Sequence, residues 1–385
     1  MKDLSIYFTK VNPTFHSKQE ESIGNIIRAY NEVNGFPTID GKGIAIFDVP
    51  EYRNSEFKNH KFNLQFRNHF YNLFKGVSWE TDLYDLGTII PGKDISDTIH
   101  AVESVCYELI KNDVIPIVIG GTQELTMGVY NAYEKLEQLI NLSTIDNKLD
   151  IGDIQEDISA NGWLNHILLK KPSFLFNYSN IGAQAHYISP QTFNLFEELQ
   201  FDICRLGTIN NDIEEGEPYL RNTDVLSFDL TSIRSSDLQN LFYTSPNGLF
   251  ANEICRLMRY AGISDKLSSV GIFNYYSDNH EVTDELVAQL IWYFIEGYSH
   301  RKGDFPIGAK KEYLKYRVYQ DELGEEIVFY KSNKSGRWWI EVPYPSRSNS
   351  KLIRHQLVPC SYKTYKKATK GEIPNLWWRT YQKFV

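Results

Sequence analysis

Residues 114–121 read Val-Ile-Pro-Ile-Val-Ile-Gly-Gly, an apolar run that ends in two glycines. A run without polar alternation is typical of a strand buried on both faces of a parallel sheet, and glycine permits the tight turn that follows it. Residues 94–112 and 123–140, on either side of this run, place apolar residues at helical spacing. The alternation of helix, strand and helix predicts one unit of an α/β protein.

The same alternation continues along most of the chain. We expect a three-layer α/β/α sandwich whose mostly parallel sheet is covered by helices on both faces. The segment 208–217 is acidic and polar, which predicts a solvated loop. Further strands are predicted at 44–49, 174–176, 181–183, 225–229 and 269–273, and further helices at 190–199, 248–262 and 283–299.

Three segments at predicted strand ends carry polar residues: Gly-Gly-Thr-Gln-Glu at 120–124, Asp-Asn-Lys-Leu-Asp at 146–150 and Ser-Phe-Asp-Leu-Thr at 227–231. They resemble the ureohydrolase family of arginase, agmatinase and formimidoylglutamase. In that family the segments read Gly-Gly-x-His, Asp-x-His-x-Asp and Ser-x-Asp-x-Asp, and six side chains hold two manganese ions. Gly-Ala-Gln at 182–184 is similar to a formimidoylglutamase motif. The resemblance covers roughly residues 40–300 and implies the arginase-like sandwich.

Half of the implied metal ligands are replaced. The resemblance implies a first ion at Gln123, Asp146, Asp150 and Asp229, and a second at Lys148, Thr231, Asp146 and Asp229. Gln123 and Lys148 stand where the family has histidines, and Thr231 stands where it has aspartate. An ammonium has no acceptor for a cation, so we expect at most one ion, held by Asp146, Asp150 and Asp229. Such an ion would be Mg²⁺, Ca²⁺ or Mn²⁺. Asn274 stands at a position where the resemblance implies a substrate-binding Glu.

Three functions are compatible with this degenerate metal-binding pattern. The first is a pseudoenzyme, without catalytic residues or cofactor, that acts as a binding or scaffold subunit. The second is a divergent, formimidoylglutamase-like hydrolase that cleaves a C–N bond of linear amidines with one metal ion. The third is a small-molecule sensor that uses the old pocket. For the pseudoenzyme we predict that the Lys148 ammonium lies within about 4 Å of Asp229 or Asp146, in place of the lost ion.

The pattern of the sequence changes near residue 300, where the alternation of helices and strands ends. This change predicts a ureohydrolase-like domain over 1–300 and a C-terminal extension over 301–385. The extension has 18 basic and 8 acidic residues, a net of +10, whereas the remainder nets −19. Residues 313–345 alternate like antiparallel strands with a turn at 333–336, and tryptophan pairs stand at 338–339 and 377–378. We expect the extension to pack on the acidic body, to self-associate or to bind a protein partner. Nucleic acid is disfavoured, since no nucleic-acid-binding motif is present.

The cellular location is predicted from what the sequence lacks. The four cysteines show no paired spacing, which fits a reducing compartment, and Cys106 and Cys204 lie in apolar surroundings. The N-terminus has no apolar signal segment, and no run approaches the roughly 20 apolar residues that span a bilayer. These features predict a cytoplasmic protein.

Overall fold

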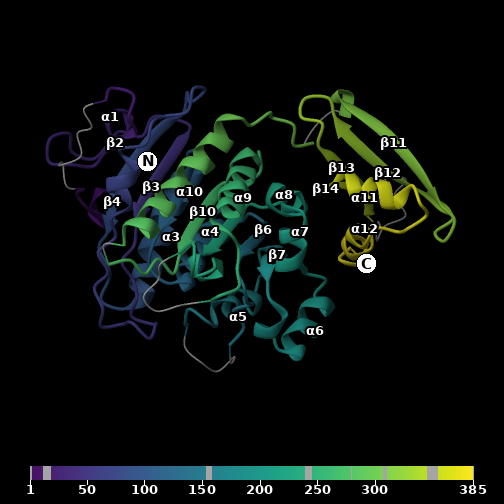
Figure 1. Cartoon of the computed structure of the whole chain (residues 1–385), viewed down its shortest axis with the longest axis horizontal. Helices are drawn as coiled ribbons and strands as arrows, with labels where there is room; N and C mark the ends of the chain where they lie inside the picture. The colour runs from purple at the N-terminus through teal and green to yellow at the C-terminus, as the bar shows by residue number, and fades with distance from the viewer. Residues whose placement is uncertain are drawn as a thin grey trace.

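The central sheet of the body has ten strands (Figure 1). The computed structural model describes residues 2–11, 19–152, 158–238, 245–278, 280–306, 310–344 and 354–384. The strand order is β1-β4-β3-β5-β10-β9-β6-β7-β8, with β2 beside β4, and every pairing is parallel except that of β1 with β4. The strands are β1 Phe8–Thr9, β2 Arg28–Ala29, β3 Gly43–Asp48, β4 Asp82–Ile89, β5 Val114–Ile119, β6 Ile140–Ile145, β7 Leu175–Ala183, β8 Asp202–Arg205, β9 Val225–Asp229 and β10 Ser269–Phe273.

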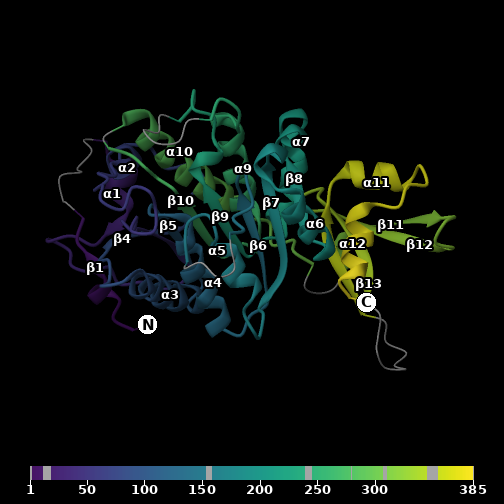
Figure 2. The ribbon, with the colours of Figure 1, turned by 90° about the horizontal axis from the view of Figure 1, so that it is seen from below.

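Helices cover both faces of this sheet, as Figure 2 shows. One hydrophobic cluster joins α2, α7, α8, α9 and α10 to one face, and a second joins α3, α4, α5 and α6 to the other. The helices are α1 Ile23–Ile26, α2 Phe66–Phe70, α3 Ile95–Lys111, α4 Thr126–Lys135, α5 Trp163–Leu168, α6 Pro190–Glu198, α7 Leu206–Asn211, α8 Glu217–Arg221, α9 Ala251–Ile263 and α10 Glu281–Ser299. The predicted three-layer sandwich with a mostly parallel sheet is therefore confirmed.

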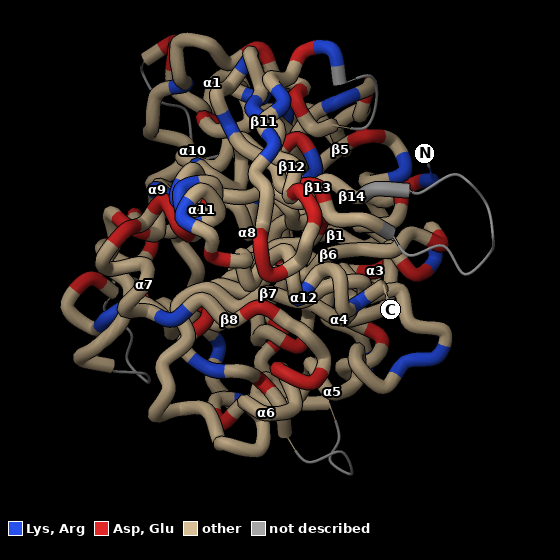
Figure 3. Tube along the Cα trace, turned by 90° about the vertical axis from the view of Figure 1, so that its right-hand side faces the viewer, with Lys and Arg blue, Asp and Glu red and all other residues tan. Residues whose placement is uncertain are grey.

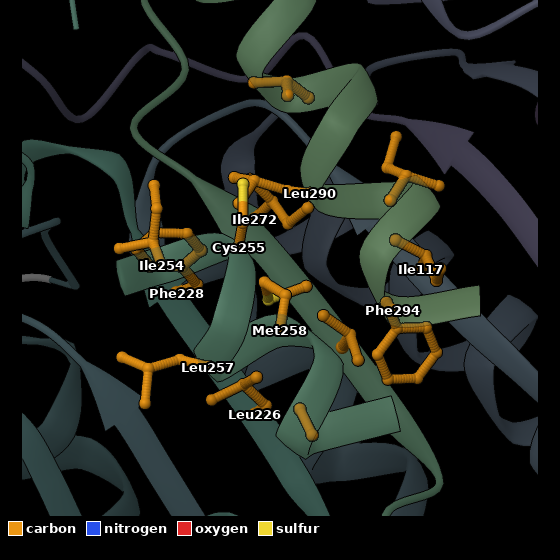
Figure 4. Packing of buried hydrophobic residues seen from close by; sticks show 14 of the residues in the cluster. Ile117, Leu226, Phe228, Ile254, Cys255, Leu257, Met258, Ile272, Leu290 and Phe294 are labelled. Carbon is orange, nitrogen blue, oxygen red and sulfur yellow. The ribbon is translucent and has the colours of Figure 1, made fainter. Parts of the chain in front are cut away.

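The packing of α9 against α10 depends on two glycines. A Cβ atom at Gly262 would lie 2.1 Å from the Phe294 carbonyl oxygen, and one at Gly297 would lie 2.2 Å from the Arg259 carbonyl oxygen. Figure 4 shows the apolar side chains of both helices meeting strands β9 and β10 beneath them. Every residue of β3, β5, β6, β9 and β10 is buried, as expected for strands covered on both faces.

Two local predictions were wrong. Residues 208–217 are helical rather than a loop, because they span the end of α7, a 3-10 turn at Ile213–Gly216 and the start of α8. The two strands predicted at 174–176 and 181–183 are a single strand, β7. The amide nitrogen of Asn180, in the middle of this strand, donates to Thr144 Oγ1 at 3.0 Å and to the Lys148 carbonyl at 2.9 Å.

The C-terminal extension forms a second, antiparallel sheet of four strands in the order β11-β12-β13-β14. The strands are β11 Tyr313–Gln320, β12 Glu325–Ser332, β13 Trp338–Tyr344 and β14 Arg354–Cys360; helices α11 Tyr362–Ala368 and α12 Asn375–Gln382 pack on one face. The predicted turn at 333–336 joins β12 to β13. These elements confirm the antiparallel strands expected in the extension.

Buried contacts join the extension to the body. Arg221, at the end of α8, donates to the carbonyl of Trp338 at 3.1 Å and to that of Cys360 at 3.0 Å. Its guanidinium lies 4.6 Å from the ring centroid of Trp339, which is fully buried. Arg337 lies 3.9 Å from Glu217 of α8. Trp339 thus covers part of the body, whereas the Trp338 ring packs inside the extension against Tyr316 and Tyr365.

Candidate functional site

Four neighbouring strands bring the three polar segments to one edge of the sheet. The strands β5, β10, β9 and β6 are adjacent in this order and parallel, so their carboxyl ends meet at that edge. Gly121, after β5, has φ +70°, and a Cβ atom there would lie 2.7 Å from the Val49 carbonyl oxygen. Only glycine fits this turn, which directs Gln123 toward the ends of β6 and β9.

The three predicted carboxylates are buried, with exposures of 1% for Asp146, 2% for Asp150 and 0% for Asp229. Each accepts a hydrogen bond from a protein N–H group. Asp146 Oδ1 accepts from the Lys148 backbone at 3.0 Å, and Asp229 Oδ1 accepts from the Thr231 backbone at 2.7 Å. Asp150 Oδ2 accepts from Trp163 Nε1 at 2.9 Å. Protein donors therefore occupy part of the coordination capacity of every carboxylate.

The Gln123 amide lies between two of these carboxylates. With its nitrogen toward them, it donates to Asp150 Oδ2 at 2.9 Å and to Asp146 Oδ2 at 3.2 Å, while its oxygen accepts from Ser227 Oγ at 3.2 Å. The opposite orientation would set the amide oxygen against two carboxylates, which the hydrogen-bond geometry disfavours. The resemblance had implied an amide oxygen as a metal ligand; the amide is instead arranged as a donor.

Lys148 differs from its predicted placement. Its ammonium forms an ion pair with Asp150 Oδ1 at 3.4 Å and donates to Asn161 Oδ1, whereas we had expected Asp229 or Asp146 as the partner. The side chain remains 28% exposed, since the loop carrying Asn161 draws its end outward. Its charge still acts on the whole cluster, because it lowers the pKa of both Asp146 and Asp229.

Burial sets the acid–base state of the cluster. It raises the pKa of Asp146 well above its ordinary value, and the charges of Asp150 and Asp229 raise it further. Burial also raises the pKa of Asp229, although Lys148 opposes the shift. One lysine and one neutral amide thus compensate the carboxylates only in part, and the remaining repulsion favours uptake of protons.

The two remaining predicted positions lie beside Asp229. Thr231 is half-buried and accepts a hydrogen bond from Asn147 Nδ2 at its carbonyl, 3.1 Å away. Asn274 follows β10 in the left-handed region, with φ +55°, and its Oδ1 accepts from Tyr276 at 3.0 Å. A side-chain hydrogen bond from Asn274 also contributes to the electrostatics of Asp229. The structure therefore brings all seven predicted positions to one edge of the sheet.

One buried acid was not predicted from the sequence. Glu124 directly follows Gln123, is fully buried, and burial raises its pKa to about 7. Glu124 lies in the segment that the motif search singled out, but nothing in the sequence showed that a glutamate there would be inaccessible to water.

The Gly-Ala-Gln motif at 182–184 makes a structural contact. The Gln184 amide donates to the Asn247 carbonyl at 3.2 Å and accepts from the Asn247 amide nitrogen at 3.1 Å.

The donor set does not fit a pair of manganese ions. Lys148 and the Gln123 nitrogen present N–H groups, which cannot ligate a cation, and Thr231 offers no charge. Throughout the described part of the chain, no three His, Cys, Asp or Glu side chains are arranged to hold a metal ion. The arrangement is suited to a network of buried hydrogen bonds and one ion pair.

The fold defines a structural class, and comparison with known proteins then identifies the family. A mostly parallel sheet between two helical layers, with polar loops at its carboxyl edge, defines an α/β protein of the arginase-like class. The arginase family model matches residues 56–296. Because this match spans more than half of the sequence, the chain belongs to the arginase family.

Solved structures agree with this assignment. A formiminoglutamase from Trypanosoma cruzi solved with Mn²⁺ has a TM-score of 0.61 at 17% identity, covering 68% of this chain and 94% of its own. Formimidoylglutamase from Bacillus subtilis gives 0.63 at 16% identity, covering 76% and 96%. The agmatine ureohydrolase of Thermoplasma volcanium gives 0.56 at 20% identity, covering 68% and 92%. No curated protein matches the chain. The resemblance to formimidoylglutamase-like members is confirmed at the level of the fold.

Proposed function

We propose that this arginase-family protein is a pseudoenzyme that has lost binuclear hydrolysis and acts as a binding or scaffold subunit. The observation that carries the proposal is the position of the Gln123 amide, whose inward-facing atom lies 2.9 Å from Asp150 Oδ2 and 3.2 Å from Asp146 Oδ2, so that the amide nitrogen there donates to both. A metal ion draws carboxylate oxygens together by its positive charge, and here an N–H donor fulfils that task. Binuclear hydrolysis needs a metal-bound hydroxide, and this cluster offers no replacement for one.

Lys148, which stands where the resemblance implies a ligand of the second ion, supports the same proposal. Its ammonium holds Asp150 at 3.4 Å and supplies a permanent positive charge to the buried acids. The Thr231 position adds a neutral side chain where the family has a ligand. Together these residues give a cluster that stabilises the folded protein without metal.

The alternative is a hydrolase of linear amidines with one divalent ion. It is favoured by the survival of Asp146, Asp150 and Asp229 at adjacent strand ends. That alternative requires the Gln123 amide to turn its oxygen inward and to give up both donor bonds. A sensor that binds a small molecule in the old pocket is the third candidate, and it needs no change in the cluster.

Metal analysis distinguishes these candidates. The purified protein is incubated with excess Mn²⁺, passed through a desalting column, and measured by inductively coupled plasma mass spectrometry. The same preparation is assayed for ammonia, urea or formamide release from linear amidines and guanidines. We expect no stoichiometric metal and no turnover. Two ions per chain would overturn the proposal, and one ion accompanied by turnover would establish the hydrolase.

Location and partners are also proposals. We place the protein in the cytoplasm, supported by four buried cysteines that form no disulfides. Within the described residues, no helix has the length and apolar character needed to cross a bilayer. We place the scaffold surface on the C-terminal extension, through a protein partner or a second copy of this chain. Its support is the large aromatic content of an added domain.

A further inference from the structure

A cavity of about 270 Å³ lies between the body and the extension. Strands β7 and β8 and helix α8 line one side, and β14, α11 and α12 line the other. In Figure 2 this boundary runs beside β7 and β8, where α11 and α12 approach the body. Ligand pockets favour boundaries between structural units, and this volume suits a molecule of amino-acid size.

The wall formed by the body is acidic. Asp202, on β8, is 13% exposed and accepts one hydrogen bond from Asn177 at 3.1 Å through Oδ2. Its Oδ1 lies 4.0 Å from Arg379, beyond hydrogen-bond reach. Glu215 also lines the cavity, with Lys363 at 3.6 Å. Burial, followed by the charges of Glu215 and Asp202, raises the pKa of the nearby Cys204 thiol to about 12, so the negative potential reaches into this wall.

The wall formed by the extension is basic. Arg379, on α12, lines the cavity; it donates to the Phe201 carbonyl at 3.1 Å and lies 3.5 Å from the exposed Glu197. Lys383 lies one helical turn further along and lines a small recess that shares Asp202 and Arg379 with the cavity. Burial lowers the pKa of Lys383, and its ammonium donates to the Asn177 amide oxygen. Arg379 thus has carboxylates at 3.5 and 4.0 Å, both longer than a close ion pair, and Lys383 donates to an amide oxygen rather than to a carboxylate.

A tyrosine side chain completes the cavity. Tyr219, on α8, is partly buried and lines it. Burial, and then the charges of Asp202 and Glu215, raise its pKa, so the hydroxyl stays protonated. A ligand that accepts from or donates to this hydroxyl would gain a hydrogen bond inside the cavity.

We propose that this cavity binds a small zwitterion that carries one ammonium and one carboxylate. The ammonium contacts Asp202 and the Tyr219 hydroxyl, and the carboxylate contacts Arg379 and Lys383. A simple amine would satisfy only the acidic wall, and a simple carboxylate would meet the repulsion of Asp202 and Glu215. Only a molecule with both charges matches both walls.

The two walls belong to different parts of the chain, which gives binding a structural consequence. The ligand bridges β8 and α8 of the body to α12 of the extension, so it strengthens their docking by mass action. None of these residues belongs to the strand-end cluster around Gln123. The inference therefore stands independently of whether that cluster retains catalysis.

Binding is tested by isothermal titration of the full chain with a series of ω-amino acids from glycine to 6-aminohexanoate. Butylamine and butyrate serve as probes with one charge each, matched to 4-aminobutyrate. We expect at least one zwitterion to bind about tenfold or more tightly than either single-charge probe of its length. No binding across the series at millimolar concentration would overturn the proposal, as would equal binding of butylamine.

Variants assign the binding to this cavity. Asp202→Asn and Arg379→Gln should each weaken the zwitterion about tenfold or more, and Tyr219→Phe should weaken it less while preserving the cavity's shape. Arg317→Gln is the matched control, because Arg317 lies on the extension sheet and pairs there with the exposed Glu326. If Asp202→Asn fails to fold, Tyr219→Phe and Arg379→Gln decide. Unchanged binding in all the variants that fold would overturn the assignment.

Discussion

At the scale of single residues, the candidate site has N–H donors at two positions where the resemblance implies metal ligands. An ion compensates converging carboxylates by charge; here the Gln123 amide compensates them by hydrogen bonds and Lys148 by an ion pair. Neither replacement restores the full charge of a cation pair, and the pKa of Asp146 accordingly rises. The three replacements at Gln123, Lys148 and Thr231 are therefore physically linked, since each suits a cluster without metal.

Restoring the family ligands should restore metal binding. In the triple variant Gln123→His, Lys148→His and Thr231→Asp, donors are replaced by imidazole and carboxylate ligands, so we expect Mn²⁺ to bind at least about tenfold more tightly than to the wild type. The double variant Lys148→His with Thr231→Asp should recover part of this affinity. Isothermal titration with Mn²⁺ measures both. A folded triple variant without added affinity would falsify the assignment of these positions.

Lys148 also makes a testable contribution to stability. Lys148→Met keeps the apolar stem but leaves Asp150 without its ion pair in a buried cluster. Breaking a fully buried pair costs about 3–5 kcal/mol, and the partial exposure of Lys148 lowers our expectation to about 2 kcal/mol. Urea unfolding gives the value, with the exposed Lys302→Met as the control. Equal midpoints for Lys148→Met and wild type would show that the ammonium does not stabilise the cluster.

At the scale of elements, the sequence predicted the apolar strands and missed the polar ones. The strands β3, β5, β9 and β10 were found because most of their residues are apolar. The strand β4 was missed because it contains Asp85, whose burial becomes clear only when Arg67 and Tyr71 are seen to bind it. Pattern recognition along one chain cannot supply such partners, which arrive from other elements.

The candidate site was predictable to the same degree. The order of the three polar segments and their placement at strand ends follow from the motifs, and the structure confirms that they meet. The partner of Lys148 was not predictable, because it depends on Asn161, thirteen positions further along a loop. The orientation of the Gln123 amide depends on Ser227 and two carboxylates from other strands. Short sequence motifs were therefore enough to predict which segments meet, but not which side chains pair within the site.

Besides its apolar residues, the helix α2 contacts the sheet through a largely buried arginine, and removal of this side chain should be costly. Arg67 pairs with Asp48 at 2.6 Å and with Asp85 at 2.7 Å, and its side chain is 12% exposed. Arg67→Met leaves two buried carboxylates uncompensated, so we expect a loss of about 3–5 kcal/mol in chemical unfolding. The surface pair Arg317–Glu326 is the comparison, and Arg317→Met should leave the unfolding midpoint unchanged. Similar losses in both variants would contradict this reasoning.

At the scale of the whole molecule, the charge split of the sequence becomes an interface within one chain. Lys363 on α11 pairs with Asp212 and Glu215 of the body, and Arg379 pairs with Glu197. Figure 3 looks onto the extension, where Lys and Arg positions on α11 lie among Asp and Glu positions of the body. Surface pairs of this kind orient the docking more than they stabilise it, and the buried contacts of Arg221 and Trp339 carry the stability.

Removal of the extension should therefore expose a surface that the body cannot satisfy alone. A chain ending at residue 306 loses the Trp338 and Cys360 carbonyls that accept from Arg221 and the Trp339 ring that covers it, which leaves Arg221 with Glu217 at 3.0 Å. We expect a lower melting temperature, stronger binding of a hydrophobic dye and aggregation in light scattering. The full-length variant Arg221→Met should also melt lower, because the unpaired carbonyls remain buried. A truncated protein that stays monodisperse and melts like the full chain would show that the extension is an independent appendage.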